Sequence, residues 1–464
     1  MALLIKNGTI VTAESISHKD ILIEEDKISR IESNIFIDGI EMIDAEGKYV
    51  IPGGVDVHTH LDMPLGNIVS RDDFETGTRA AAFGGTTTII DYATQSRGMR
   101  MQEALEIWHR KAAGKACIDY GFHMIVTELR NSFDEDLKEM IREGVTSFKL
   151  FMAYPGSLMV DDETILQALK ISGKHGGLIC LHAEDGNDID MRVKLALASG
   201  NISPKYHALT RPPSTEAIAV RRAIALAAKA NAPLYIVHVS SSDALKEIEQ
   251  GKRKNLPVLG ETCPQYLFLS IDDIDKPNFE GAKYVFTPPV REHDHQDVLW
   301  KGLISNTLDV VATDHCPFNF IGDKEIGREN FAKIPNGGPG IENRLHLLFE
   351  GGVNEKRISL NRWVDLVSTR PAKIFGLFPR KGTIAVGSDA DIVIWDPTKD
   401  HRISASTHHM RVDYNMYEGT KIMGDVTIVL SRGKIIVQEG KWRGSLKHGN
   451  FLTRDLFGFQ INHS

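Results

Sequence analysis

Short apolar runs alternate with longer amphipathic stretches through the middle of the chain. The runs are rich in β-branched residues and have the length of buried strands, whereas the amphipathic stretches repeat with the period of an α-helix. We expect strands at residues 55–58, 87–91, 121–126, 147–151, 178–182, 234–238, 257–261 and 310–314. Helices are expected between most of them, at 73–83, 101–113, 134–143, 162–174, 215–230, 243–250 and 294–304.

This alternation predicts an α/β fold in which eight parallel strands close into a (β/α)8, TIM-like barrel. Parallel neighbours need a crossover connection, and a helix supplies it. An open, doubly wound sheet is the structural alternative. No Gly-x-Gly-x-x-Gly run follows the first strand, so a nucleotide site of the kind found in that fold is unsupported.

Both ends of the chain have a different sequence pattern, in which short β-rich runs are separated by turn residues. Such runs fill the first part of the chain and return at 382–387, 391–395, 426–430 and 434–437. Neither end holds enough strands for a stable sheet of its own, so we expect the two ends to pair. The predicted organisation is a β-domain from 1–52 plus 376–440, a barrel from 53–375, and a tail from 441–464 that contacts a neighbour in an oligomer.

Composition narrows the classes of protein. Of 464 residues, 42% are hydrophobic and 25% are charged, which excludes a disordered or fibrous chain. No apolar run approaches the ~18 residues of a membrane helix, and the N-terminus turns polar too early for a signal peptide. The net charge of −8 includes no basic block, so we expect no nucleic-acid partner. The four cysteines lie far apart without a Cys-x-x-Cys pair, which predicts reduced thiols and a cytoplasmic protein.

Residue types that bind metals recur at the ends of the predicted strands. They are His58 and His60 after the first strand and His182, His238 and Asp314 after later ones. Side chains at i and i+2 share one face of a strand, so both imidazoles of the first pair can reach one cation. In a barrel these strand ends meet at one mouth, where catalytic groups lie. The set predicts a nitrogen and oxygen site for Zn²⁺, with Mn²⁺ or Co²⁺ as alternatives.

Each of these residues also has an ordinary structural explanation. His182 or His238 alone is more often a hydrogen-bonded core histidine, and Asp314 alone could cap a turn. Another His-x-His pair, at 293–295, opens a predicted helix, where positions i and i+2 point in different directions. We expect that pair to be solvated rather than metal-binding. Convergence of the others on one barrel mouth is what favours metal binding.

A lysine ends the fourth strand inside an apolar run. An ammonium at Lys149, buried among phenylalanines and beside cations, would be costly. Two changes lower that cost: loss of the proton, or reaction of the amine with CO₂ to give a carbamate. A carbamate is an anion with two oxygens, suited to bridging two metals about 3.5–4 Å apart.

Four runs make the chain recognisable. Residues 53–64 (GGVDVHTHLDMP), 148–154 (FKLFMAY), 260–267 (GETCPQYL) and 313–318 (TDHCPF) resemble the hydantoinase and dihydropyrimidinase branch of the amidohydrolase superfamily. The likeness covers essentially the whole chain. It implies a barrel that carries a small β-sandwich built from both chain ends, in agreement with the pattern above.

The resemblance implies a role for each residue of the metal-binding type. The ligands of two zinc ions would be His58, His60 and Asp314 for one and His182 and His238 for the other. Lys149, as N6-carboxylysine, would bridge the two ions together with a hydroxide that attacks the amide carbonyl. Asp314 would act as general base and then as general acid toward the departing ring nitrogen.

The resemblance also implies the substrate contacts. The Tyr154 hydroxyl would stabilise the oxyanion. Backbone groups of Thr287 and Asn336, both next to prolines, would bind the imide edge of the substrate. An adaptable apolar wall around the exocyclic substituent would be formed by Leu65, Leu158 and Met159. The implied substrate is a cyclic diamide, either a 5,6-dihydropyrimidine or a 5-substituted hydantoin, which is opened to an N-carbamoyl amino acid.

The sequence leaves other functions possible. Dihydroorotase-like proteins typically carry an arginine two residues after the His-x-His pair, where this chain has Asp62. An acid there would repel a carboxylate substrate, which disfavours that activity. An allantoinase-like amidohydrolase, a hydrolase of linear amides and a non-catalytic scaffold homologue remain the alternatives.

Oligomerisation is a further expectation. Members of the resembled family are usually tetramers, so we expect a homotetramer or a homodimer. The tail carries apolar residues that need a surface, either on their own barrel or on a partner subunit. They are Phe451, Leu452, Leu456, Phe457 and Phe459.

Overall fold

The central sheet has eight parallel strands in chain order. The computed structural model describes residues 2–458. The strands are β8 (Gly54–Thr59), β11 (Thr86–Thr94), β12 (Asp119–Ile125), β13 (Ser147–Phe151), β14 (Leu178–His182), β15 (Leu234–Ile236), β16 (Val258–Thr262) and β17 (Val310–Val311). All eight expected strands exist, although β15 and β17 end two and three residues earlier than predicted.

This sheet curls and closes on itself. Thr59, at the end of β8, forms a parallel bridge with His315, just after β17. The buried guanidinium of Arg344 donates to the carbonyls of Val55 and Val311, on the first and last strands, over 3.1 and 3.0 Å. These contacts join the two edges of the sheet. The barrel prediction is confirmed, and the open, doubly wound alternative is wrong.

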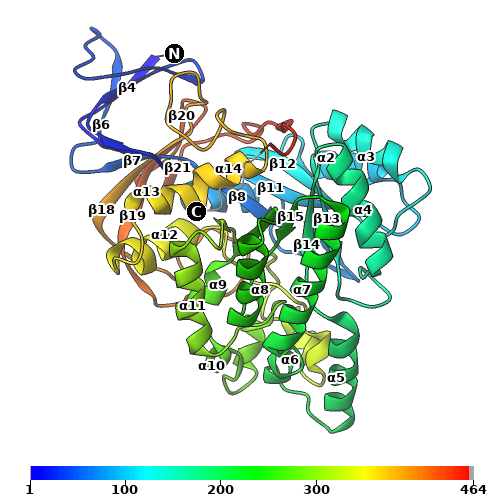
Figure 1. Cartoon of the computed structure of the whole chain (residues 1–464). Coiled ribbons are helices and arrows are strands. Elements are labelled where there is room, and N and C mark those ends of the chain that lie inside the picture. Colours follow the sequence, from blue (N-terminus) through cyan, green and yellow to red (C-terminus); the bar gives the residue numbers. More distant parts are fainter. Residues whose placement is uncertain (1, 459–464) are drawn as a thin grey trace.

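Helices cover the outside of the barrel (Figure 1). The longer ones are α1 (Thr76–Phe83), α2 (Met101–Ala112), α3 (Phe133–Arg142), α4 (Asp162–Lys174), α5 (Gly186–Ala198), α7 (Pro213–Ala230), α8 (Ser242–Arg253) and α11 (His293–Ile304). The short ones are α6 (Lys205–Leu209), α9 (Pro264–Phe268), α10 (Ile271–Ile274), α12 (Arg344–Leu348), α13 (Leu360–Val364) and α14 (Arg370–Ile374). Short 3₁₀ and π turns are η1 (Glu280–Tyr284), η2 (Lys324–Gly327), η3 (Phe331–Lys333), η4 (Phe349–Asn354) and η5 (Asp365–Thr369). Within residues 2–458 no helix is both long and apolar enough to cross a membrane.

Local sequence explains where the helices begin and end. In α4, the Asp161 carboxylate accepts a hydrogen bond from the Thr164 amide over 2.8 Å, which caps the helix start. Asp162 and Glu163 in the first turn and Lys174 in the last complement the helix dipole. All seven predicted helices are present, with ends shifted by up to three residues. The prediction missed α5, whose apolar side chains are not arranged as a core face.

The two ends of the chain form two sheets beside the barrel. One has the order β5 (Lys27–Glu32), β4 (Asp20–Glu24), β1 (Ala2–Lys6) and β6 (Glu41–Asp44). The other has the order β21 (Lys441–Trp442), β20 (Lys434–Gln438), β19 (Lys421–Ser431), β18 (Ile392–Arg402), β7 (Tyr49–Pro52), β2 (Thr9–Val11) and β3 (Ile16–Ser17). Figure 1 shows the blue N-terminal and orange C-terminal strands side by side.

The pairing of the two ends runs through β7 and β18. These strands are antiparallel, with Pro52 opposite Ile392. One buried cluster joins Ile21, Val50 and Leu430, which come from both sheets and both ends of the chain. The expected sandwich is therefore confirmed. The residue limits of the domains stay a prediction.

The described part of the tail lies on its own barrel. Phe451 forms a parallel bridge with Tyr120, at the start of β12. Leu452 is fully buried, whereas Leu456 is 48% exposed. The surface that the first apolar residues of the tail require is thus supplied by the same chain. Phe459 lies outside the described residues.

Candidate metal centre and substrate pocket

A cavity of about 700 Å³ lies at the carboxyl ends of the barrel strands. It is lined by five of the six residues of the metal-binding type, namely His60, Lys149, His182, His238 and Asp314. The sixth, His58, is fully buried beneath them. This position agrees with the general rule that barrel enzymes carry their catalytic groups at the carboxyl ends of the strands.

The predicted ligands approach one another closely. Asp314 Oδ1 lies 3.1 Å from His58 Nε2 and 3.2 Å from His60 Nε2. Lys149 Nζ lies 2.9 Å from the same His58 nitrogen. On the other side of the centre the rings of His182 and His238 meet edge to face, with centroids 4.6 Å apart. The structure therefore brings all six residues together.

Two buried carboxylates orient the imidazoles, and neither was predicted to have a role at this site. His58 Nδ1 donates to Glu261 over 2.6 Å, which leaves Nε2 facing the centre. His182 Nε2 donates to Glu184 over 2.8 Å, which leaves Nδ1 free. A carboxylate on the outer nitrogen fixes the tautomer and raises the basicity of a metal-ligating histidine. Glu184 could have been found from its position two residues after His182 at a strand end.

The backbone at three of these positions is unusual. His238, Asp314 and Tyr154 have φ values of 40°, 52° and 67°, a left-handed conformation that non-glycine residues rarely adopt. Such strain persists only where the surroundings fix it. Beside Asp314, Thr313 donates through its amide and hydroxyl to Asp56 over 3.1 and 2.6 Å. The strand ends are therefore bent so that the side chains converge.

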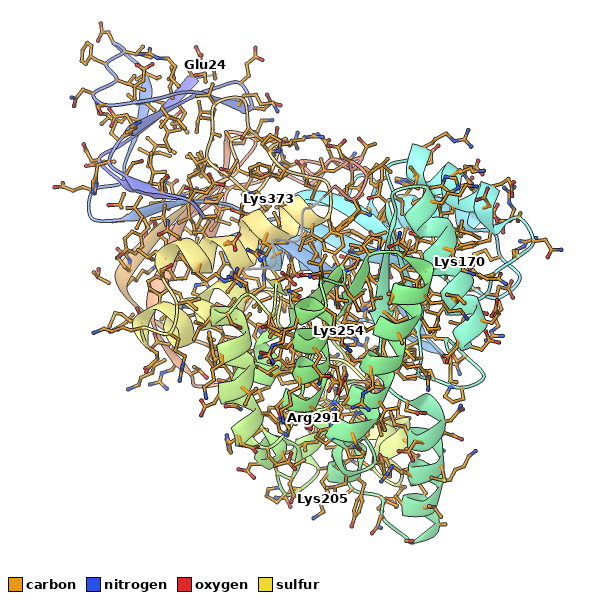
Figure 2. All side chains as sticks on the ribbon, in the orientation of Figure 1. Glu24, Lys170, Lys205, Lys254, Arg291 and Lys373 are labelled. Carbon is orange, nitrogen blue, oxygen red and sulfur yellow. The ribbon has the colours of Figure 1, made fainter. Side chains whose placement is uncertain are left out.

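A buried ion pair supports the loop after His238. Arg291, labelled in Figure 2, is 4% exposed and donates to Ser240 over 3.0 Å and to Glu216 over 3.2 Å. Glu216 also accepts from the amide of Ser240 over 2.8 Å. Helix α7 and the loops that carry Ser240 and Arg291 are thus held together around the turn that presents His238.

Lys149 has an unusual environment for a lysine. Its side chain is 1% exposed and forms no ion pair with any carboxylate among residues 2–458. The Nζ atom lies 4.3 Å from the ring centroid of Tyr92. Burial lowers the pKa of Lys149 below its usual value. An amine without a carboxylate partner, surrounded by imidazoles, fits conversion to an anion better than a free ammonium.

Two imidazoles and one carboxylate of the cluster have protonation states that suit a divalent cation, whereas the pKa of His58, which burial and Lys149 act to lower, is raised by Glu261 and Asp314. Burial lowers the pKa of His60 to about 4 and that of His238 well below its usual value, so both imidazoles are neutral at pH 7. Burial acts to raise the pKa of Asp314, but His58 and His60 hold it well below its usual range. Neutral imidazoles with one carboxylate form a donor set that Zn²⁺, Mn²⁺ or Co²⁺ accepts. The residues present therefore fit a metal.

The substrate-side residues line the same cavity. Tyr154, Thr287 and Asn336 are all on its surface, and the ring of Tyr154 lies 5.5 Å from that of His182. Burial raises the pKa of Tyr154 to about 12, so its hydroxyl keeps its proton. Thr287 Oγ1 lies 3.3 Å from His207 Nε2.

The apolar wall differs in part from the expectation. Leu65 and Leu158 line the cavity, but Met159 does not. The sulfur of Met159 instead lies against Gly186, where an added Cβ would come within 3.0 Å of it. Ile326, in η2, also lines the cavity and was not predicted from the sequence, because no pattern connects it to the barrel mouth.

Two other histidine groups lie away from this cavity. His346, His401 and Asp425 have donor atoms within 4.8 Å of one another, but Lys399 pairs with Asp425 over 2.9 Å and neutralises its charge. In the 293–295 pair, the expected solvation is wrong for the second histidine. His295 is 8% exposed, and its Nδ1 accepts from the Ser242 amide over 3.0 Å.

Comparison with known proteins agrees with this geometry. Residues 49–436 match the Amidohydrolase family, and the chain belongs to that family of barrel hydrolases. It is 52% identical over 459 residues to a D-hydantoinase of Geobacillus stearothermophilus, covering 99% of this chain and 98% of the relative. A D-phenylhydantoinase of Escherichia coli is 43% identical over 460 residues, covering 98% and 99%.

The likeness extends to solved structures. The crystal structure of dihydropyrimidinase from Brevibacillus agri superposes with a TM-score of 0.98 at 52% identity, covering 99% of this chain and all of that one. Within the amidohydrolases, this chain therefore stands in the D-hydantoinase and dihydropyrimidinase branch, as the sequence motifs indicate.

Proposed function

We propose that this chain is a two-metal hydrolase that opens 5,6-dihydropyrimidine or 5-substituted hydantoin rings to N-carbamoyl amino acids. One observation carries the proposal: six ligand-type side chains converge beneath a cavity whose wall holds Tyr154. The D-hydantoinase relative at 52% identity over nearly its whole length supports the substrate class.

The residues that would hold the two divalent cations are His58, His60 and Asp314 for one and His182 and His238 for the other. Zinc is the first choice, with Mn²⁺ or Co²⁺ as alternatives. When bound, such ions supply a nucleophile at neutral pH by lowering the pKa of water, and they polarise a carbonyl. Lys149, as N6-carboxylysine, would bridge them: its neutral amine adds to the carbon of CO₂ and releases one proton.

The remaining steps fall to side chains of this chain. Asp314 would take a proton from the attacking water and return it to the ring nitrogen as the C–N bond breaks. The Tyr154 hydroxyl would donate to the carbonyl oxygen as negative charge develops there. Backbone groups at Thr287 and Asn336 would bind the imide edge, and Leu158 would contact the 5-substituent together with Leu65.

The test is a hydrolysis assay with dihydrouracil, hydantoin, 5-phenylhydantoin, allantoin and a linear amide, on protein whose metal content is measured. We expect turnover of the first three, loss on chelation and recovery with Zn²⁺. Preference for allantoin would assign an allantoinase-like enzyme. Turnover of linear amides alone would assign a different hydrolase, and no turnover by metal-loaded protein would assign a scaffold homologue.

We also propose a cytoplasmic location and a homotetramer, with a homodimer as the alternative. All four cysteines are buried and unpaired, which supports a reducing compartment. The oligomer rests on the family resemblance, since the described tail lies on its own barrel. Light scattering tests it, and a monomer would refute it.

A further inference from the structure

Lys324, the first residue of η2, is a second fully buried lysine near the cavity. Its side chain has no exposed surface. The ammonium donates to three backbone carbonyls, those of Val285 and Pro335 over 2.9 Å each and that of Gly337 over 2.7 Å. An ammonium has three protons, so every donor is used. No carboxylate among residues 2–458 forms an ion pair with it.

These three carbonyls belong to the two segments expected to bind the substrate. Val285 lies two residues before Thr287, and Pro335 and Gly337 flank Asn336 on either side. The amide of Gly337 also donates to the carbonyl of Val285 over 3.1 Å. One ammonium therefore joins two segments that are far apart in sequence, at the place where both reach the cavity.

The segment after the metal ligand Asp314 meets the same point. A Cβ added at Gly337 would come within 2.2 Å of the Cys316 carbonyl oxygen. That oxygen belongs to backbone, which cannot move aside cheaply. The Gly337 peptide is consequently enclosed between Lys324 and the strand end that carries Asp314.

Lys324 is itself held in place through its neighbour. The Asp323 carboxylate accepts from Arg71 Nε over 2.5 Å and from the Asn319 amide over 2.9 Å. The amide of Arg71 donates to the Pro317 carbonyl over 2.8 Å. The ammonium thus projects from a turn that is fastened to the loop after the first barrel strand.

Burying the Lys324 ammonium has a free-energy cost, which bears on why a lysine stands at this position. A buried charge without a counter-ion loses its hydration, and here only three neutral carbonyls compensate. Burial lowers the pKa of Lys324 to about 7, whereas the neighbouring Asp323 carboxylate acts to raise it. An apolar side chain would avoid that desolvation, but it would leave three carbonyls without donors.

We propose that Lys324 is a positioning residue for substrate recognition, whose ammonium fixes the spacing between the Thr287 and Asn336 backbones that bind the imide edge. The expected change in KM rests on the proposed function. The hydrogen bonds of the Lys324 ammonium can be tested separately. Lys324 contacts neither the metal ligands nor the substrate, so its loss affects binding more than chemistry.

The experiment compares K324M and K324Q with the wild type. K324M removes all three donors, and we expect KM for dihydrouracil to rise at least about tenfold while kcat changes less than about threefold. K324Q keeps an amide with two donors, so its KM should lie between the other two. Metal content per chain should be the same in all three proteins.

A matched control separates positioning from general destabilisation. Leu22 is 2% exposed in the small sandwich, so L22A lowers the melting temperature without touching the cavity. We expect wild-type KM in L22A. Hydrogen exchange followed by mass spectrometry should show faster exchange in peptides covering 335–338 in K324M and K324Q, but not in L22A.

The outcomes distinguish the two claims. Wild-type KM and wild-type exchange in K324Q, with an active parent enzyme, would overturn the positioning role. A parent enzyme that opens none of the rings would overturn the proposed function, while the exchange measurement would still decide whether Lys324 fixes these segments. If K324M does not fold, K324Q and its exchange pattern decide the question alone.

Discussion

Replacing Glu261 with glutamine should weaken metal binding without removing any predicted metal ligand. The carboxylate accepts from His58 Nδ1 over 2.6 Å, and both side chains are fully buried. It also accepts from the Tyr235 hydroxyl over 2.9 Å and from the His238 amide over 3.1 Å. One carboxylate therefore orients residues of both predicted metal sites.

The size of the effect follows from the His58 contact. A charge-assisted hydrogen bond of this kind contributes about 1.5–3 kcal/mol. In E261Q, an amide N–H that faces His58 would force the imidazole proton onto Nε2 and remove the lone pair that a metal needs. We expect metal affinity to fall about 10–100-fold, the range typical for loss of such a partner. That range corresponds to about 1.4–2.7 kcal/mol.

The assay is competition with a chelator, which gives the dissociation constant for Zn²⁺ in the wild type and in E261Q. Turnover per bound metal pair should change less than the affinity does, because no reacting group is removed. E247Q is the matched control: Glu247 is 8% exposed and pairs with Arg221 over 2.7 Å, away from the cavity. Equal affinities in E261Q and the wild type would refute the orienting role.

Three further outcomes are expected. K149A should lose the metal pair and turnover, and acetate or propionate should restore part of both by supplying the missing carboxylate; full metal loading of K149A without them would contradict the bridge. L158F should shift kcat/KM from bulky toward small 5-substituents, and unchanged ratios across a hydantoin series would argue against Leu158 in the wall. Burial acts to raise the pKa of Asp389, but Lys381 at 2.9 Å outweighs it and lowers that pKa to about 2. The Asp389 carboxylate therefore stabilises the fold above its unfolded pKa of about 3.9, and this contribution is lost as the pH falls toward 2. Unfolding monitored by circular dichroism should therefore show a smaller loss of stability between pH 4 and pH 2 in D389N than in the wild type, and parallel losses would exclude this linkage.

The positions of the predicted metal ligands could be inferred from the sequence because they depend on local structure. A strand end fixes where a side chain points, and barrel topology brings all strand ends to one mouth. His58, His182 and Lys149 were therefore placed correctly without knowledge of distances. The helical period of the apolar positions likewise predicted seven helices, because the apolar faces of these helices pack on the sheet.

The features that were not predicted depend on contacts between distant segments of the chain. Glu261 ends a predicted strand inside one of the recognised runs, but nothing local to it indicates that it contacts His58. Lys324 binds carbonyls from other parts of the chain, and it lies in no pattern that distinguishes it from a surface residue. Met159 was expected in the pocket from its loop, but the turn at Tyr154 directs it toward α5. His295 was expected in solvent, but its partner amide is on α8.

The antiparallel contact between β7 and β18 has a consequence for synthesis. A growing chain exposes the edge of its earliest strands until Ile392 has left the ribosome, after the whole barrel sequence has been made. Exposed edges of this kind invite association with other chains. Premature termination anywhere before β18 should therefore yield insoluble product, and a circular permutant that begins within the barrel and links the native ends would let the sandwich strands emerge in succession.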